Sequence, residues 1–148
     1  MNEKTKHTLV VSNNLFFNEL ISFVDEGKSV MFFIKGNSML PFLKNGEKVV
    51  VEPLNDCDIK KGSIVLANSH IGVVLHRIVK VKKDVIWLAG DGNLLQHEII
   101  KRNDLIGVVK QVIRKENIVR LDTSSAIFRS MCWYYIRPFR IVVKKLKF

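Results

Sequence analysis

The sequence of 148 residues lacks several patterns that mark specialised classes of protein. Its two cysteines, Cys57 and Cys132, are far apart and form no CxxC pair, so we expect no disulfide framework and a reducing compartment. The four histidines are scattered without the spacing of metal ligands, and we therefore expect no metal and no other cofactor. The apolar stretches near the N-terminus, TLVV and VMFFI, are far shorter than the roughly 20 residues that cross a bilayer.

The chain also lacks signs of export or of division into several domains. Its first residues, MNEKTKHTLVVSNN, contain neither the apolar core nor the small-residue cleavage site of a secretory signal. We therefore expect a cytoplasmic protein, either free or peripheral on the inner face of the membrane. No repeat, low-complexity run or Pro/Ser-rich linker interrupts the sequence, and its hydrophobic content of 47% fits one globular domain.

Negative charge is scarce. Asp and Glu number 14 against 24 Lys and Arg, which gives a formal net charge of +10. This excess favours an anionic partner: nucleic acid, a membrane surface or an acidic peptide. Nucleic acid is the least favoured of the three, because no helix-turn-helix pattern or zinc spacing accompanies the charge.

The apolar pattern predicts a mainly β protein with helices at its two ends. A helical stripe of apolar residues predicts a short amphipathic helix over about 13–26, ended by Gly27. From Val30 onwards, β-branched and aromatic runs predict strands at 30–36, 47–53, 62–69, 72–81, 84–90 and 105–114. Short strands without long helices between them indicate a compact, strongly bent β-sheet or barrel.

The segment 123–148 differs from the preceding β domain, 1–122, and predicts a basic amphipathic helix. Asp122 is the last acidic residue, and Pro138 should divide the helix into two pieces because proline lacks a backbone donor. Two interpretations stay open: a helix docked on the sheet with a solvated basic face, or an in-plane anchor on an anionic membrane. On a helical wheel one face collects apolar residues and another basic ones: Phe128, Met131, Tyr135, Phe139, Val142 and Leu146 against Arg129, Arg140, Lys144 and Lys147.

Ser38 lies in a turn-like stretch, GNSMLP, between two predicted strands. A serine hydroxyl acts as a nucleophile only with a base in hydrogen-bond reach and donors for the developing oxyanion. Gly36 allows a tight turn where the strand ends, and Pro41 stiffens the chain beyond it. We expect this turn, with Gly36, Ser38 and Met39, to form an oxyanion hole from backbone donors, chiefly the Ser38 N–H. Taken alone, the stretch fits an ordinary turn hydroxyl better.

His76 and Asp91, which lie later in the chain, also fit a catalytic site. In GVVLHRIVKV, strand alternation places His76 on one face with Val74 and Ile78. Such a histidine is either a core residue or a base held neutral and rigid near its nucleophile. Asp91 lies in the glycine-flanked turn LAGDGN, where it either forms the turn or holds an imidazole in the correct tautomer.

In their order, GNSMLP, NGEKVVVEP, KKGSIVLAN, VLHRIVKV, LAGDGN and DLIGVVKQV resemble the type I signal peptidase and LexA-like serine peptidase group, from about Val30 to Val112. The resemblance implies a largely antiparallel, bent β fold with Ser38 as the nucleophile. Bacterial signal peptidases and LexA use a lysine base, whereas endoplasmic-reticulum-type signal peptidases use histidine in an H-R-[VI] motif. That histidine corresponds to His76, so the chain looks closest to the Ser–His branch.

The sequence departs from this pattern at the acid. The endoplasmic-reticulum type carries further aspartates a few residues after its G-D-N-N motif, where this chain has Gln96, His97 and Glu98. We expect Asp91 to be the acid that orients the base; Glu98 in its place, or no acid at all, are the alternatives. Some signal peptidases use a serine two residues before the nucleophile as an oxyanion donor, and here that position is Gly36.

These features predict a signal peptidase-like serine endopeptidase that cleaves an extended leader or precursor peptide. The resemblance implies that small residues lie next to the cleaved bond. LexA-like self-cleavage of a repressor is less favoured for two reasons. About 35 residues precede the Ser38 turn, too few for a DNA-binding domain and linker, and the one Ala-Gly pair, Ala89-Gly90, lies after the turn and within the domain. A non-catalytic peptide- or membrane-binding module on a peptidase fold is the other hypothesis, and the altered acid motivates it.

Overall fold

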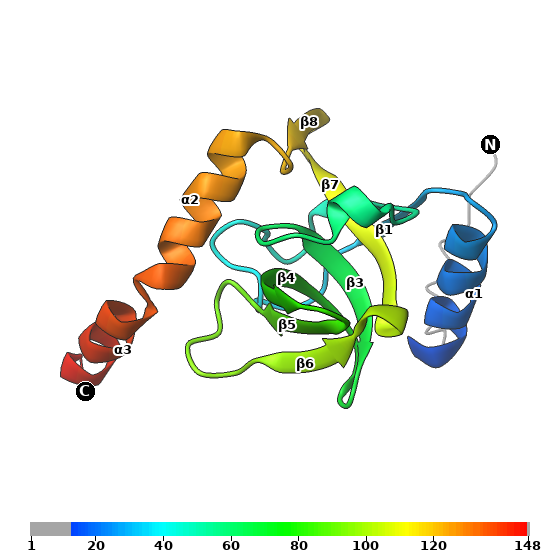
Figure 1. The fold of residues 1–148 in the computed structure, drawn as a ribbon. Helices are drawn as coiled ribbons and strands as arrows, with labels where there is room; N and C mark the ends of the chain where they lie inside the picture. The colour runs from blue at the N-terminus through cyan, green and yellow to red at the C-terminus, as the bar shows by residue number, and fades with distance from the viewer. Residues whose placement is uncertain (1–12, 148) are drawn as a thin grey trace.

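A computed structural model describes residues 13–147 as a curled β-sheet with helices at both ends of the chain (Figure 1). The elements are, in order, α1 (Asn13–Asp25), β1 (Val30–Phe33), β2 (Lys48–Glu52), η1 (Asp56–Asp58), β3 (Ile64–Ser69), β4 (Gly72–Lys82), β5 (Val85–Ala89), β6 (Glu98–Lys101), η2 (Arg102–Asp104), β7 (Leu105–Arg114), β8 (Asn117–Arg120), α2 (Ser124–Tyr135) and α3 (Arg137–Leu146). The stretch up to Ser12, where the sequence predicts no secretory signal, lies outside the described residues.

The strands form one antiparallel sheet in the order β1-β2-β7-β3-β4-β5-β6, and β8 pairs with β7. Each predicted strand is present, and the mainly β, bent fold is confirmed. Register shifts in the β2–β7, β3–β7 and β4–β5 pairs bend the sheet, because an extra residue on one strand increases the local twist. The strands β6 and β8, of four residues each, were not predicted.

Two apolar clusters lie on the two faces of β3. Ile64 and Leu66 belong to the larger cluster, which also receives Leu20 and Val24 from one face of α1. The intervening residues of β3 join the smaller cluster, because successive side chains point to opposite faces of a strand. Of the described residues, none after Leu121 belongs to either cluster, so the sheet and α1 enclose the core without α2 and α3.

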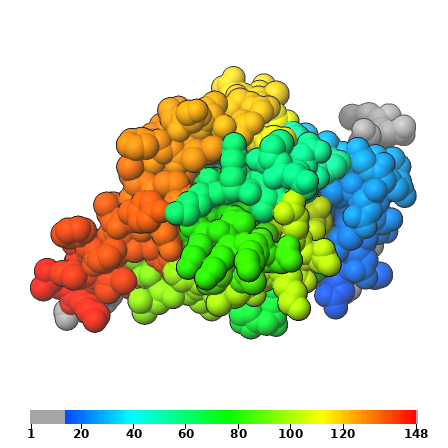
Figure 2. Space-filling model, in the orientation of Figure 1, coloured from blue at the N-terminus to red at the C-terminus, as the bar shows by residue number. Residues whose placement is uncertain are grey.

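Helices α2 and α3 lie along one end of the sheet, and α3 projects beyond it (Figures 1 and 2). The Thr123 side chain caps α2 by accepting a hydrogen bond from the Ala126 N–H at 3.2 Å. The chain leaves helical geometry at Ile136, and Pro138 lies in the first turn of α3, so the predicted division into two helices is confirmed. No helix among the described residues is long and apolar enough to span a membrane.

Candidate active site

Ser38 lies on the turn that leads from β1 to β2. The turn begins at Gly36, whose φ of +99° is a conformation that favours glycine. The Gly36 N–H donates to Asn45 Oδ1 at 2.8 Å. Gly36 therefore shapes the turn, and its N–H is already bound to Asn45. This differs from the expectation that Gly36 contributes to the oxyanion hole. Met39 is buried and fixes the turn to the core, while Ser38 is exposed.

The turn between β5 and β6 packs directly against the Ser38 turn. The Gly92 N–H donates to the Ser38 carbonyl at 2.8 Å. A Cβ atom at Gly90 would lie 2.5 Å from the Ser38 carbonyl oxygen and 3.1 Å from His76 Nε2. Only glycine permits so close an approach of the two turns. The backbone of Ser38 and the imidazole of His76, which are far apart in the sequence, therefore meet at this point.

His76 on β4 is paired with Glu98, the first residue of β6. The distance from His76 Nδ1 to Glu98 Oε2 is 2.6 Å, and the exposed fractions of the two side chains are 6% and 1%. With Nδ1–H donating to the carboxylate, Nε2 is the ring atom left to accept a proton. Nε2 is also the atom that approaches Gly90 beside the Ser38 turn. This arrangement can hold an imidazole base in one tautomer and one orientation.

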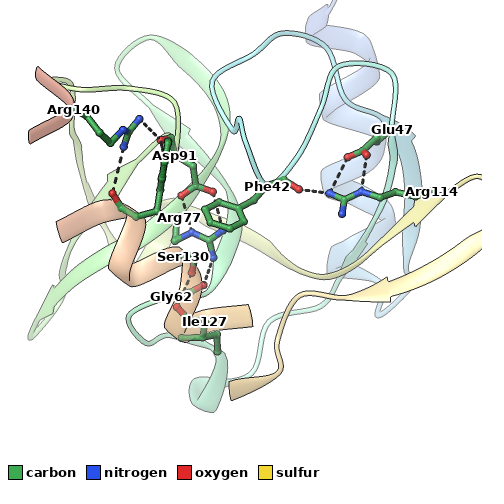
Figure 3. A network of polar contacts seen from close by, with 10 residues as sticks. Phe42, Glu47, Gly62, Arg77, Asp91, Arg114, Ile127, Ser130 and Arg140 are labelled. Atoms are coloured by element: carbon green, nitrogen blue, oxygen red, sulfur yellow. Dashed lines mark hydrogen bonds and ion pairs between the residues drawn. The ribbon is translucent and has the colours of Figure 1, made fainter. Parts of the chain in front are cut away.

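Asp91 has a different partner from the one expected. Its carboxylate accepts two hydrogen bonds from Arg77, Nε to Oδ1 and Nη2 to Oδ2, both at 2.8 Å (Figure 3). Arg77 Nη1 also donates to the Gly62 carbonyl at 2.7 Å. The prediction that Asp91 orients His76 therefore disagrees with the geometry, and Glu98 occupies that position. The reason is that His76 and Arg77 are adjacent on β4, so their side chains leave opposite faces of the strand.

A cleft of about 360 Å³ opens above the His76–Glu98 pair. Ser38 and Met39 line it, together with residues that follow β1 and residues at the start of β4: Ile34, Lys35, Ile71, Val73, Val74 and Leu75. Asn93 and Gln96 line this cleft and also a larger hollow of about 780 Å³, which is bounded by Ile141, Lys144 and Lys145 of α3. The two hollows therefore adjoin, and α3 borders the approach to the site.

Ser38 is exposed and lies near His76 without a hydrogen bond between their side chains in the described part of the chain. Within residues 13–147, no hydrogen bond joins Ser38 to His76, and the Ser38 N–H has no acceptor. Catalytic hydrogen bonds are often long or poorly aligned in the absence of substrate and tighten when it binds. No group of three or more His, Cys, Asp or Glu side chains in the described part of the chain could hold a metal ion.

A family model described as Peptidase S24-like matches residues 2–113. The chain belongs to the Peptidase S24-like family. This confirms the resemblance to the signal peptidase and LexA-like group, and with it a serine peptidase-type fold. No curated protein matches the chain. The matched range includes Ser38, His76 and Glu98 and ends within β7, so α2 and α3 lie outside the part shared with the Peptidase S24-like family.

In this Peptidase S24-like chain the two C-terminal helices contact the turn behind Ser38. Trp133 Nε1–H donates to the Asp91 carbonyl at 2.8 Å, and Arg140 Nη2 donates to the same oxygen at 3.1 Å (Figure 3). The Arg140 guanidinium also lies 3.9 Å from the centre of the Trp133 ring. The Asp91 residue thus binds Arg77 through its side chain and the helices through its backbone.

His97, in the loop before β6, makes a second set of contacts with the helices. Its Nε2 lies 2.9 Å from Tyr134 Oη and 3.0 Å from Arg137 Nη1. Burial lowers the pKa of His97 below the ordinary value of 6.5, and the positive charge of Arg137 lowers it further. The neutral imidazole is therefore the form that suits this contact.

The sequence did not predict these contacts, because the face of the C-terminal segment that packs on the domain is not its apolar face. Ser130 and Arg137 are buried, and Ile127 packs against Gly62, where a Cβ atom would lie 2.5 Å from Ile127 Cγ2. Ile127, Ser130 and Arg137 are separated by three and then seven residues, which is the spacing of one helical face. Tyr134 and Ile141 continue that face, which was the signal available in the sequence.

Proposed function

We propose that this chain is a serine endopeptidase of the signal peptidase type, with Ser38 as nucleophile and His76 as general base. Glu98, rather than Asp91, is the proposed acid that orients His76. One observation carries the proposal: a buried His76–Glu98 pair, with Nδ1 and Oε2 2.6 Å apart, lies under a cleft lined by the exposed Ser38. A buried pair of this kind, with its second ring nitrogen aimed at a serine turn, has the arrangement of a Ser–His–acid triad.

The proposed reaction is acyl transfer followed by hydrolysis. Ser38 Oγ attacks the carbonyl carbon of the scissile peptide while His76 Nε2 takes the hydroxyl proton, and Glu98 stabilises the imidazolium that forms. The Ser38 N–H donates to the oxyanion. His76 then gives the proton to the leaving amine, and the C–N bond breaks to leave an acyl group on Ser38. Water, deprotonated by the same imidazole, releases the acid product and restores Ser38.

An extended peptide fits the backbone edges that line the cleft. Among residues 13–147, β1 pairs with β2 alone, and β4 pairs with β5 only from Arg77 onwards. Residues just after β1 and the first half of β4 both line the cleft. A substrate strand beside either edge would gain main-chain hydrogen bonds, and small pockets would select its side chains. By family resemblance, we expect small residues next to the cleaved bond.

The test is labelling by a serine-reactive phosphonate probe, read by intact mass. We expect the wild-type protein to be labelled once and the Ser38→Ala variant not at all. Ser22→Ala, an exposed serine on α1, is the matched control and should label like the wild type. His76→Ala should also lose labelling while keeping the wild-type circular dichroism spectrum.

The alternative is a non-catalytic peptide-binding module that keeps the peptidase fold. It is favoured by the lack of a hydrogen bond between Ser38 and His76 in the part of the chain that the structure describes. A folded wild-type protein that takes up no probe, yet binds extended peptides, would replace the enzyme proposal by this one.

Self-cleavage is disfavoured by the position of the Ala89-Gly90 pair. Ala89 is a buried residue of β5, opposite Arg77 in the ladder, and Gly90 packs under the Ser38 carbonyl. Neither residue lines the cleft, so that peptide bond would have to leave its place in the sheet to enter it. Intact mass after long incubation at alkaline pH should therefore show one species.

A further inference from the structure

Helix α3 is amphipathic, but its apolar face points away from the protein. Phe139, Val142, Val143 and Leu146 have exposed fractions of 75%, 54%, 52% and 80%. At helical spacing these four side chains occupy one side of the helix. A helix that stabilises a soluble domain turns such a face toward the core. Here the arrangement is reversed.

The opposite face of α3 is polar, and it is the face that the domain holds. Arg137 is buried with its guanidinium 5.1 Å from the centre of the Tyr134 ring and in contact with His97. Arg140 is fixed by the Asp91 carbonyl and by stacking on Trp133. These contacts set the rotation of the helix about its axis, so the outward direction of the apolar face is built into the fold.

The apolar face continues onto α2. Phe128 and Tyr135 have exposed fractions of 70% and 59%. Tyr135 follows Phe128 by seven residues, and Phe139 follows Tyr135 by four. We call the exposed set of both helices the apolar stripe: Phe128, Tyr135, Phe139, Val142, Val143 and Leu146. None of these side chains belongs to a core cluster of the described residues.

Charge identifies the kind of surface that would cover the stripe. Residues 123–148 contain six Lys and Arg and no acidic residue. Lys145 and Lys147 are exposed, and on the helical wheel they flank the apolar side of α3. A second copy of the chain would bring two such basic segments together, each on a molecule of net charge +10. An anionic lipid surface would instead attract both flanks and receive the aromatic and aliphatic side chains between them.

We propose that the apolar stripe binds in the plane of an anionic membrane, with the polar face of α3 and the β domain on the aqueous side. Because α3 borders the hollow that adjoins the Ser38 cleft, binding would place the mouth of the site beside the lipid surface. Partitioning itself needs no peptidase activity, so it can succeed or fail independently of the proposed function.

The test uses the full chain and sedimentation with vesicles of phosphatidylcholine alone or with phosphatidylglycerol. Wild type should sediment with the anionic vesicles and only weakly with neutral ones. The double variant Phe139→Ser/Leu146→Ser should lower the partition constant by about tenfold or more, because each large apolar side chain loses its transfer into the interface. Lys145→Gln/Lys147→Gln should lower binding less and reduce its sensitivity to salt.

The matched control is Ile99→Ser/Ile118→Ser, which removes two apolar side chains of β6 and β8 with exposed fractions of 62% and 63%. It should sediment like the wild type, and all variants should share one circular dichroism spectrum. Wild type that stays in solution with anionic vesicles would overturn the proposal, as would equal binding by the Phe139→Ser/Leu146→Ser variant. A second outcome would also overturn it: the wild type is a dimer in size-exclusion chromatography and does not bind vesicles, and Phe139→Ser/Leu146→Ser is a monomer. The stripe would then be assigned to contact with a second copy.

Discussion

Glu98 and Asp91 are both buried carboxylates near the same turn, but they contact different cations or bases. Glu98 contacts His76, and Asp91 forms a two-bond ion pair with Arg77. Substitution of each acid by its amide keeps the shape and removes the charge. The two variants should therefore fail in different ways.

The Glu98→Gln variant should lose reactivity while keeping its stability. Its neutral amide can turn its NH2 group toward Nδ1 and so favour the wrong tautomer of His76, and it has no charge with which to stabilise the imidazolium. By analogy with acid-to-amide changes in other triads, we expect the rate of phosphonate labelling to fall by about 10²- to 10⁴-fold. The measurement is the second-order rate constant of labelling, compared with that of the wild type at the same pH.

The Asp91→Asn variant should show the opposite behaviour. It leaves the Arg77 guanidinium, with an exposed side-chain fraction of 3%, without its counter-charge. Loss of one partner of a buried pair destabilises a protein by about 3–5 kcal/mol, so urea unfolding should shift strongly to lower concentration. Labelling of the fraction that remains folded should stay well above that of Glu98→Gln. The reverse ranking of the two variants would restore Asp91 as the acid.

Gly90→Ala tests whether the contact between the two turns positions the nucleophile. The added Cβ atom would overlap the Ser38 carbonyl oxygen at 2.5 Å and press on His76 Nε2 at 3.1 Å. We expect labelling to fall at least about tenfold, since a displacement near 1 Å can cost a factor of about 10² in rate. Gly27→Ala is the control: its φ is +85°, nothing lies within 4 Å of the added atom, and only stability should decline.

The sequence could single out Ser38 and His76 as candidate site residues because each lies in a recognisable motif beside a strand. It could not assign the acid, because the choice depends on which face of β4 each neighbouring side chain leaves and on how the turn after β5 folds back. The sequence supports Glu98 only as an alternative, since the apolar alternation in LLQHEII is too short to reveal β6. Closing the sheet brings Glu98 to His76, opposite Leu88 of β5.

Helix α2, helix α3 and the loop before β6 meet at His97, and this junction should depend on pH. The folded protein holds the pKa of His97 below 6.5 through burial and the charge of Arg137, although the neighbouring Glu98 acts in the opposite direction. The unfolded chain therefore binds the proton more readily. Stability from this group is complete above about pH 6.5 and declines as the pH falls through the lower, folded pKa.

We expect the urea midpoint of the wild type to fall more between pH 7.5 and pH 5.5 than that of His97→Gln. Glutamine offers Tyr134 and Arg137 a polar partner that does not titrate in this range. The difference between the two proteins isolates His97 from other titrating groups. Parallel pH profiles would contradict the expected role of this junction.

At the level of elements, every strand except β6 and β8 followed directly from a β-branched run, whereas the packing of the C-terminal helices could not be predicted. The helical wheel correctly grouped the apolar residues, but the face that packs on the domain carries Ser130 and Arg137 instead. Periodicity can separate the faces of a helix, yet it does not say which face the fold buries. That choice depends here on the Asp91 carbonyl and on His97, which lie far away in the sequence.

In the whole molecule, the core and the C-terminal helices are separable. Both apolar clusters of the described residues are complete by Leu121, and the family match ends before α2. A chain ended after Asp122 should therefore fold cooperatively, with the β-rich circular dichroism spectrum of the sheet. Its melting temperature should be lower than that of the full chain, because Gly62 and the Asp91 carbonyl lose Ile127 and Trp133. A non-cooperative transition would show that the helices are part of the core.

The turn of Gly90, Asp91 and Gly92 is held on one side by the Ser38 backbone and on the other by Trp133 and Arg140. Both the Ser38 backbone and the C-terminal helices thus contact this turn directly. If occupancy of the cleft and burial of the apolar stripe each shift this turn, they share a coupling free energy. Thermodynamic reciprocity then requires that a lipid surface change the affinity for a substrate analogue by the same factor by which the analogue changes the affinity for lipid.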